Sequence, residues 1–178
     1  MPAHPVPFLS NVVAEVLGGE VVDSPRPRVV QTLAASTLLG MLSEPFMRGH
    51  GGPGGWLLLF APELHLIGGE VLVPELAGWR RERLPKLPDV TVMTLVPDWI
   101  CEVLSSETVA LDRGSKMLAY AHAGVKHVWL VDPDLRTLEV YRYEDDAWSL
   151  LSVHEESQRV HAEPFEVLGL ELSALWRR

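Results

Sequence analysis

A glutamate, Glu102, interrupts the short apolar segment WICEVL at residues 99–104. This composition predicts a strand that is buried on both faces, where an ionised carboxylate is costly unless it is paired or binds a cation. A second carboxylate, Glu75, follows Pro74 at the end of another apolar segment. Two carboxylates at adjacent strand ends would form a site of hard oxygen ligands for Mg²⁺ or Mn²⁺, which suits metal-assisted hydrolysis of a phosphodiester bond.

Lys116 is the cation that would act with these carboxylates. It lies one turn after Asp112 and one turn before Tyr120, so all three share one face of a helix expected at residues 111–123. If that face packs toward the strand end, the ammonium group would position the attacking water or offset charge that develops on the phosphate. An Asp and a Lys four residues apart also form a common surface pair worth about 0.3 to 0.5 kcal/mol, so the spacing fits both interpretations.

The elements that would position these residues follow from local patterns. Apolar spacing predicts a first helix at residues 25–44, with Asp23 or Ser24 as its cap and Pro45 as its stop. Gly124 is placed to end the second helix. Three short antiparallel strands are expected at 56–60, 63–67 and 71–73, and a long irregular segment at 76–97. Three further strands are expected at 126–131, 137–143 and 148–153, and a short terminal helix at 172–178. This order predicts an α+β or mixed-sheet α/β fold, in one domain over residues 1–178.

Composition and charge exclude several classes of protein. The 178 residues are 47% hydrophobic and 22% charged, which is typical of a globular protein and excludes disordered and collagenous chains. A formal net charge of −9 argues against a protein that coats nucleic acid or an anionic membrane through its overall field. Cys101 is the only cysteine, which excludes a disulfide within the chain and favours a cytoplasmic location. The apolar segments are far shorter than the roughly 18 residues that cross a bilayer.

Other residues allow two interpretations each. Arg80, Arg81 and Arg83 either bind a DNA backbone or belong to a solvated loop. Tyr120 either forms a hydrogen bond near the carboxylates or places its ring in the core and its hydroxyl at the surface. Cys101 lies in an apolar strand, which predicts a buried structural thiol and not a nucleophile.

Several motifs occur together in the order VLVPELAGWRRERLPKLP, PDWICEVLSSET, LDRGSKMLAYAHAGVKHVWLVDP and TLEVYRYEDDAW. In this order they resemble the bacterial Uma2 family of restriction-endonuclease-like proteins, within the PD-(D/E)XK nuclease-like superfamily. The resemblance is strong at residues 71–148 and weak over the first fifty. It implies a restriction-endonuclease-like fold, with a central mixed β-sheet flanked by helices and a divalent metal ion bound at strand ends.

The resemblance also implies roles for individual residues. Glu75, Glu102 and Lys116 match the catalytic set of the family, with Glu75 and Glu102 as ligands of Mg²⁺ or Mn²⁺. The family usually has Asp where this chain has Glu75, and the longer side chain displaces the carboxylate by about one carbon-carbon bond in a site that demands exact placement. Leu104 occupies the position where the superfamily usually has its catalytic lysine. The resemblance implies that Lys116, on the following helix, supplies the lysine instead. Gly19-Glu20-Val21 resembles the Gly-Glu entry of the family, which makes Glu20 an additional candidate near the metal.

Two functions from different classes follow. The first is a divalent-metal-dependent endonuclease that hydrolyses DNA. The second is a catalytically inactive nuclease-like binding or assembly module, which the presence of Glu75 in place of Asp and the acidic net charge favour. A homodimer is expected by analogy with nucleases that cut two strands, with apolar strands such as LEVY pairing at a sheet edge. Asp98, in a Pro-Asp pair, is interpreted as a strand-entry residue and not as a ligand.

Overall fold

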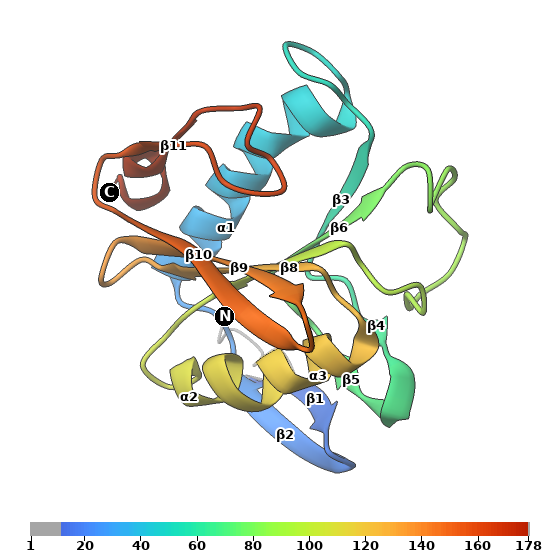
Figure 1. The fold of residues 1–178 in the computed structure, drawn as a ribbon. Coiled ribbons are helices and arrows are strands. Elements are labelled where there is room, and N and C mark those ends of the chain that lie inside the picture. The colour runs from blue at the N-terminus through green and yellow to red at the C-terminus, as the bar shows by residue number, and fades with distance from the viewer. Residues whose placement is uncertain (1–11, 178) are drawn as a thin grey trace, which may run out of the picture.

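A mixed sheet of six strands forms the centre of the computed structural model, which describes residues 12–177 (Figure 1). Two central strands are parallel, β7 (Trp99–Val103) and β8 (His127–Asp132), and the other neighbours are antiparallel. The sheet order is β10-β9-β8-β7-β6-β3, with β3 (Trp56–Phe60), β6 (Leu76–Arg80), β9 (Thr137–Glu144) and β10 (Ala147–Glu155). The prediction of a central mixed sheet flanked by helices is confirmed.

Helices cover both faces of this sheet (Figure 1). On one face α1 (Val29–Leu42) and a terminal 3₁₀ helix, η4 (Leu172–Trp176), pack on Trp99, Cys101 and Val103 of β7. The other face receives α2 (Val109–Leu111), a π-helical turn η3 (Asp112–Lys116) and α3 (Met117–Ala123), which run on continuously from one another. Because successive side chains of a strand alternate between faces, Glu102 points to the α3 side, as Ile100 does.

The helix between β7 and β8 ends before Gly124 as predicted, but it begins at Val109, two residues before the predicted start at residue 111. Ser105 accepts a hydrogen bond on Oγ from the backbone N–H of Thr108, at 3.1 Å, just before the helix. Gly124 ends the helix in the left-handed conformation with φ of 89°. These local signals are short-range hydrogen bonds and backbone preferences, which operate without help from the rest of the fold.

A smaller antiparallel sheet lies beside α3, in the order β2-β1-β5-β4. Its strands are β1 (Val12–Leu17), β2 (Glu20–Pro25), β4 (Leu64–His65) and β5 (Val71–Leu72). Gly18 and Gly19 join β1 to β2 with positive φ at both positions, as a two-residue hairpin turn requires. The three antiparallel strands expected at 56–60, 63–67 and 71–73 are present as β3, β4 and β5. They do not form one continuous set, because β3 joins the large sheet while β4 and β5 join the small one.

The first helix starts later than predicted and does not stop at Pro45. Ser24 lies in β2, and the helix begins at Val29 with Arg28 as its N-cap. Asp23 is likewise a β2 residue, so neither predicted cap lies at the helix end. The side chain of Gln31 accepts a hydrogen bond from the backbone N–H of Arg28 at 2.8 Å, which performs the capping instead. Pro45 is accommodated inside a π-helical turn, η1 (Ser43–Met47), that follows α1 directly.

The segment expected to be irregular at 76–97 begins with a central strand, β6. Its sequence LAGWR has weak strand character, but β3 and β7 pair with it on both sides. A Cβ atom at Gly78 would lie 2.9 Å from Leu58 Cδ2 and 3.1 Å from Trp99 Cε3, so the glycine permits close packing and does not break the strand. Residues 81–98 then form a long loop, fastened where Trp79 Nε1 donates to the carbonyl of Leu95 at 2.8 Å.

The LEVY segment lies in β9, between β8 and β10, and is therefore not at an edge of the sheet. In the described part of the chain the edges of the large sheet are β3 and β10. The short strands β11 (Arg159–Val160) and β12 (Leu170–Glu171) pair with each other near the end of the chain. Within residues 12–177, no helix is long and apolar enough to cross a membrane.

Candidate active site

The register of β6 and β7 brings Glu75 and Glu102 together. Leu76 pairs with Cys101 in the antiparallel ladder, so Glu75, one residue earlier, stands opposite Glu102 on the neighbouring strand. Opposite residues point to the same face of a sheet and have Cβ atoms about 4.5 to 5.5 Å apart. Glu75 Oε2 also accepts a hydrogen bond from the backbone N–H of Val103 at 2.7 Å. The two predicted carboxylates therefore meet at the end of the sheet.

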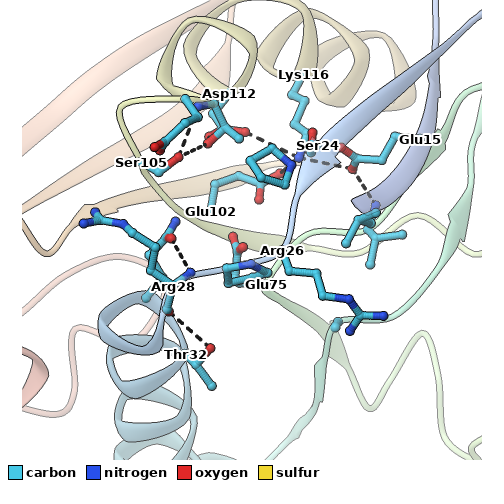
Figure 2. A pocket seen from close by; sticks show the side chains of 18 of the residues that line it. Glu15, Ser24, Arg26, Arg28, Thr32, Glu75, Glu102, Ser105, Asp112 and Lys116 are labelled. Carbon is cyan, nitrogen blue, oxygen red and sulfur yellow. Dashed lines mark hydrogen bonds and ion pairs between the residues drawn. The ribbon is translucent and has the colours of Figure 1, made fainter. Parts of the chain in front are cut away.

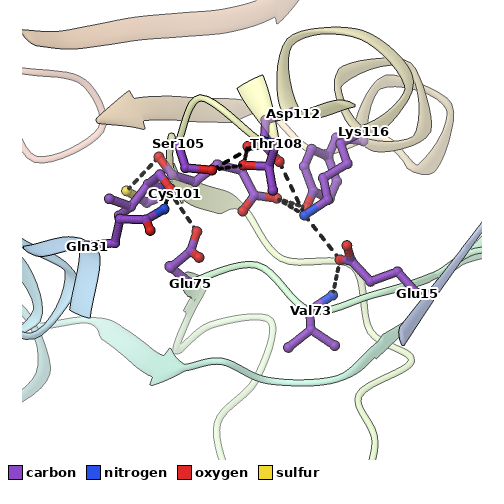
Figure 3. A network of polar contacts seen from close by, with 12 residues as sticks. Glu15, Gln31, Val73, Glu75, Cys101, Ser105, Thr108, Asp112 and Lys116 are labelled. Atoms are coloured by element: carbon purple, nitrogen blue, oxygen red, sulfur yellow. Dashed lines mark hydrogen bonds and ion pairs between the residues drawn. The ribbon is translucent and has the colours of Figure 1, made fainter. Parts of the chain in front are cut away.

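Lys116 reaches the same place from the helix. Its Nζ lies 3.3 Å from Glu102 Oε1 and 3.4 Å from Asp112 Oδ1. Figure 3 shows Lys116 beside Asp112. Only 5% of Lys116 is exposed, against 1% of Glu102 and 3% of Asp112. The four-residue spacing of Asp112 and Lys116 therefore marks a buried network of charges and not a surface pair.

A third carboxylate, Glu15, approaches Lys116 from the small sheet. Glu15 is 1% exposed, and its Oε1 lies 3.1 Å from Lys116 Nζ and accepts a hydrogen bond from the backbone N–H of Val73 at 2.8 Å. This residue was not predicted from the sequence, where Glu20 was the acidic candidate of the first element. Glu20 is exposed at the start of β2. The signal that identified Glu102, an acid at an inward position of an apolar strand, was also present in VVAEVL around Glu15.

Tyr120 completes the surroundings of Glu102. Its hydroxyl is buried and donates a hydrogen bond to Glu102 Oε1. The interpretation that places this hydroxyl at the surface is therefore wrong, because the helix turns the whole residue toward the strand. On the other side, Thr108 Oγ1 donates to Asp112 Oδ2 at 2.7 Å, which fixes the carboxylate that faces Lys116.

A cavity of about 400 Å³ opens onto these groups (Figure 2). The segment from Ser24 to Arg28, which joins β2 to α1, runs along it. Both sides of the sheet contribute to its wall, since Gln31 and Thr32 come from α1 and Lys116 from the opposite helix. Its lining includes every charged member of the cluster: Glu15, Glu75, Glu102, Asp112 and Lys116.

Burial changes the protonation of the cluster. Burial raises the pKa of Glu102 well above its usual value, and the nearby carboxylate of Glu75 raises it further, although Lys116 acts in the opposite direction. Burial likewise raises the pKa of Glu75, against the hydrogen bond from Val103. Burial alone would lower the pKa of Lys116, but the carboxylates around it, Glu102 and Glu15 foremost, more than offset this and hold its pKa above the usual range. Lys116 is therefore an ammonium ion at neutral pH, while the two glutamates resist being ionised together.

The donor chemistry of this pair fits a hard divalent cation. Two facing carboxylates with raised pKa values repel each other when ionised, and a cation between them would remove that repulsion. Mg²⁺ and Mn²⁺ take one or two carboxylates and complete their shells with water and substrate oxygens. Among residues 12–177, no three His, Cys, Asp or Glu side chains are arranged as a ready-made metal cage. The fit is therefore to an ion held by Glu75 and Glu102 with other ligands from solvent or substrate.

The arginines named from the sequence lie elsewhere. Arg80 is the last residue of β6, at the end opposite to Glu75, Arg81 and Arg83 follow it, and none of the three lines the cavity described above. Arg80 stacks on the Trp56 ring, with Cζ 4.6 Å from its centroid, and Arg83 Nη1 binds Asp98 Oδ1 at 2.7 Å. Asp98 also accepts a hydrogen bond from the backbone N–H of Arg80, so it fixes the entry to β7. Arg81 lies in the loop that follows β6 and is partly buried.

Cys101 lies fully buried on the α1 face of β7, the face opposite to that of the Glu102 side chain. Burial raises the pKa of its thiol well above the usual value. The thiol is thus kept protonated, as expected of a structural cysteine.

Comparisons with known proteins identify a matching family and a similar fold. A family model described as "Uma2: Putative restriction endonuclease" matches residues 5–174. The chain is similar in fold to a crystal structure titled as that of a putative nuclease belonging to DUF820 from Anabaena variabilis ATCC 29413, with a TM-score of 0.75 and 20% sequence identity. The similarity covers 92% of this chain and 89% of that chain. None of the curated proteins matches the sequence of this chain.

Proposed function

The chain belongs to the Uma2 family, described as putative restriction endonucleases, and from this premise we propose that it is a divalent-metal-dependent endonuclease that hydrolyses phosphodiester bonds of DNA. One observation carries the proposal: a buried ammonium group, Lys116, lies 3.3 Å from Glu102, which faces Glu75 at the wall of a cavity. Two carboxylates and a lysine are the groups that hydrolysis of a phosphodiester requires for binding a cation and for offsetting charge.

Glu75 and Glu102 would hold Mg²⁺ or Mn²⁺ through their carboxylate oxygens. When bound, such an ion supplies an activated water and Lewis-acid stabilisation of the phosphate. The Val103 N–H fixes one oxygen of Glu75, and the Tyr120 hydroxyl fixes one oxygen of Glu102. These bonds orient the two ligands before a cation arrives, which reduces the reorganisation needed on binding.

Lys116 acts as a charged donor in this proposal and not as a general base. Its raised pKa means that the amine holds its proton at neutral pH, so it would donate to a phosphate oxygen or to the attacking water and offset developing negative charge. Glu15 and Asp112 hold Nζ at 3.1 and 3.4 Å. Such a position leaves the ammonium group beside Glu102, where the phosphate would lie.

The longer side chain of Glu75 is compatible with this role. Glu75 precedes β6, and its Oε2 reaches across to the backbone N–H of Val103 on β7. The extra methylene relative to Asp thus lets the carboxylate reach a hydrogen-bond donor on the neighbouring strand, and this hydrogen bond fixes its position. This contact supports Glu75 in the role that the family gives to an Asp.

A binding or assembly module without catalysis is the second candidate. The observation in its favour is that Lys116 already has carboxylate partners within 3.4 Å, so the cluster is internally satisfied without substrate. Such a closed network would stabilise the contact between the helix and the two sheets. Under this alternative, removing the charges would change stability and leave no activity to lose.

Cleavage of labelled single- and double-stranded DNA with Mn²⁺ or Mg²⁺ separates the two candidates. Wild type is compared with Glu102→Gln and Lys116→Ala, and with Lys126→Ala as a matched control, since Lys126 is exposed beyond the helix end. Cleavage by wild type and by the control that is lost in both site variants and in a chelator is the expected result. Equal cleavage by all four proteins would reveal a contaminant, and folded proteins without any cleavage would favour the binding module.

A further inference from the structure

Phe60 is an aromatic side chain at the wall of the same cavity and has no assigned role in the proposed chemistry. It is the last residue of β3 and is 48% exposed. Among the large apolar side chains that residues 12–177 leave exposed, it is the one aromatic. The next residue, Ala61, adopts a positive φ of 45°, an uncommon conformation for a residue with a side chain, and so the chain turns sharply just after Phe60.

Phe60 stands next to the row of residues that holds the carboxylates. Its strand partner is Leu76, and the N–H of Ala61 donates to the carbonyl of Glu75 at 2.9 Å. Ala61, Glu75 and Glu102 therefore lie side by side on three neighbouring strands, about 4.8 Å apart from one strand to the next. Because side chains alternate, Phe60 points to the α1 side while the carboxylates point to the α3 side. The cavity continues around the strand ends from one side to the other.

The size of the cavity limits what can reach the carboxylates. A volume of about 400 Å³ is at the small end of ligand pockets, which hold one small molecule or a single extended group. Glu102 and Glu15 are each 1% exposed, and Lys116 5%, so these groups are reached only through the cavity. In a duplex each base is paired and stacked between its neighbours, so its face is not free to stack on a protein ring, whereas an unpaired base can stack on an aromatic side chain.

We propose that the site acts on an unpaired DNA strand, in which one base stacks on Phe60 while the adjoining phosphate lies at Glu75, Glu102 and Lys116. This inference rests on the proposed nuclease function and names its substrate class. Stacking on an aromatic ring tolerates every base, because each base has a π-face, so binding through Phe60 is independent of sequence. Arg26 and Arg28 belong to the segment that runs along the cavity, where a backbone leaving the site would pass, and the Arg28 guanidinium is paired with Asp134.

The test compares Phe60→Ala with wild type in binding a short fluorescently labelled single strand and the same sequence closed in a duplex. Binding is followed by fluorescence anisotropy with Ca²⁺ as the hard cation, and cleavage of both DNAs with Mn²⁺ is measured in parallel. Phe60→Ala is expected to raise the Kd for the single strand about 5-fold to 100-fold, as the loss of one stacked base predicts. Phe60→Tyr, which keeps the π-face, is expected to restore binding.

Val153→Ala is the matched control, because Val153 is also 48% exposed but lies on β10, outside the lining of the cavity. The inference would be overturned if Phe60→Ala bound the single strand as tightly as wild type. It would also be overturned if wild type and Phe60→Ala cut the duplex as fast as the single strand. Cleavage in either case would leave the nuclease function standing. Binding of the single strand that depends on Phe60, without cleavage of either DNA, would support the unpaired-strand site and remove the nuclease function. Absence of both binding and cleavage would overturn both.

Discussion

Lys116 and Glu15 form an ion pair, with 3.1 Å between Nζ and Oε1, that joins two layers of the fold. Lys116 belongs to the helical segment on the large sheet, whereas Glu15 belongs to β1 of the small sheet. Both side chains are buried, at 5% and 1% exposure. The candidate site is therefore complete only when the small sheet is docked against the helix.

Glu15→Gln is expected to weaken both stability and cleavage. The amide keeps the shape and can still accept the hydrogen bond from Val73, but it removes one of the charges that hold Lys116. Since other carboxylates still face the ammonium group, we expect a loss of about 1 to 3 kcal/mol in the free energy of unfolding, less than for an isolated buried pair. Denaturant unfolding measures this loss. Glu20→Gln, on the exposed end of the same hairpin, is the control, and equal effects of the two variants would contradict a positioning role for Glu15.

Divalent cations are expected to raise the melting temperature of the wild-type protein. A cation held between Glu75 and Glu102 would relieve their mutual repulsion and bind only the folded chain, which stabilises it by mass action. Thermal unfolding with and without millimolar Mn²⁺ measures the shift, and Glu102→Gln should abolish most of it. A shift of the same size in Glu102→Gln would place the bound ion elsewhere.

The pH dependence of stability in a chelator should differ between wild type and Glu102→Gln. The folded protein holds the pKa of Glu102 above its usual value of 4.5, so the folded state binds this proton more tightly than the unfolded state. The resulting stabilisation is present below pH 4.5 and is lost as the pH rises through the folded pKa. The melting temperature of Glu102→Gln, relative to wild type, is therefore expected to increase from pH 4.5 upward. A difference that stays constant, or that falls with rising pH, would mean that Glu102 ionises normally in the folded chain.

Tyr120→Phe should shift the pH profile of cleavage. The Tyr120 hydroxyl donates to Glu102, and this hydrogen bond favours the ionised carboxylate that a cation needs. Its loss would raise the pKa of Glu102 further and move the acidic limb of the profile to higher pH. Loss of this bond should also cost about 1 to 3 kcal/mol of stability. Tyr143→Phe serves as the control, because Tyr143 packs on Trp148 away from the cavity. An unchanged acidic limb in Tyr120→Phe would exclude an effect on Glu102.

The residues that were predictable from the sequence are those with a strong local signal. Glu102 is an acid inside an apolar strand. Three helical residues at four-residue spacing share one face of the helix, namely Asp112, Lys116 and Tyr120. The structure brings all four residues together. The mixed sheet was predictable for the same reason, since most of its strands are short apolar segments between turn residues. The direction of the Tyr120 hydroxyl was not, because it depends on what packs against the helix.

The features that sequence reasoning missed depend on distant partners. β6 is a strand because β3 and β7 pair on both sides of it, although Ala77 and Gly78 are poor strand residues. The assignment of β3 to one sheet and of β4 and β5 to another follows from pairing choices that no local pattern encodes. Glu15 enters the site only through this second sheet, so it could not be connected with Lys116 from spacing alone.

The attachment of the β1–β2 hairpin has a consequence for heat inactivation. In the described residues the hairpin pairs with the rest of the small sheet at one ladder position, Val16 with Val71. Side-chain contacts add to this: the N–H of Gly18 donates to Glu70, and Glu15 accepts from the N–H of Val73 and pairs with Lys116. Few backbone bonds therefore need to break for it to detach as a unit, while the six-stranded sheet stays folded. Detachment would carry away Glu15 and the segment along the cavity. Amide hydrogen exchange in β1 should thus be faster than in β7, and activity should be lost on warming before the circular dichroism of the large sheet changes.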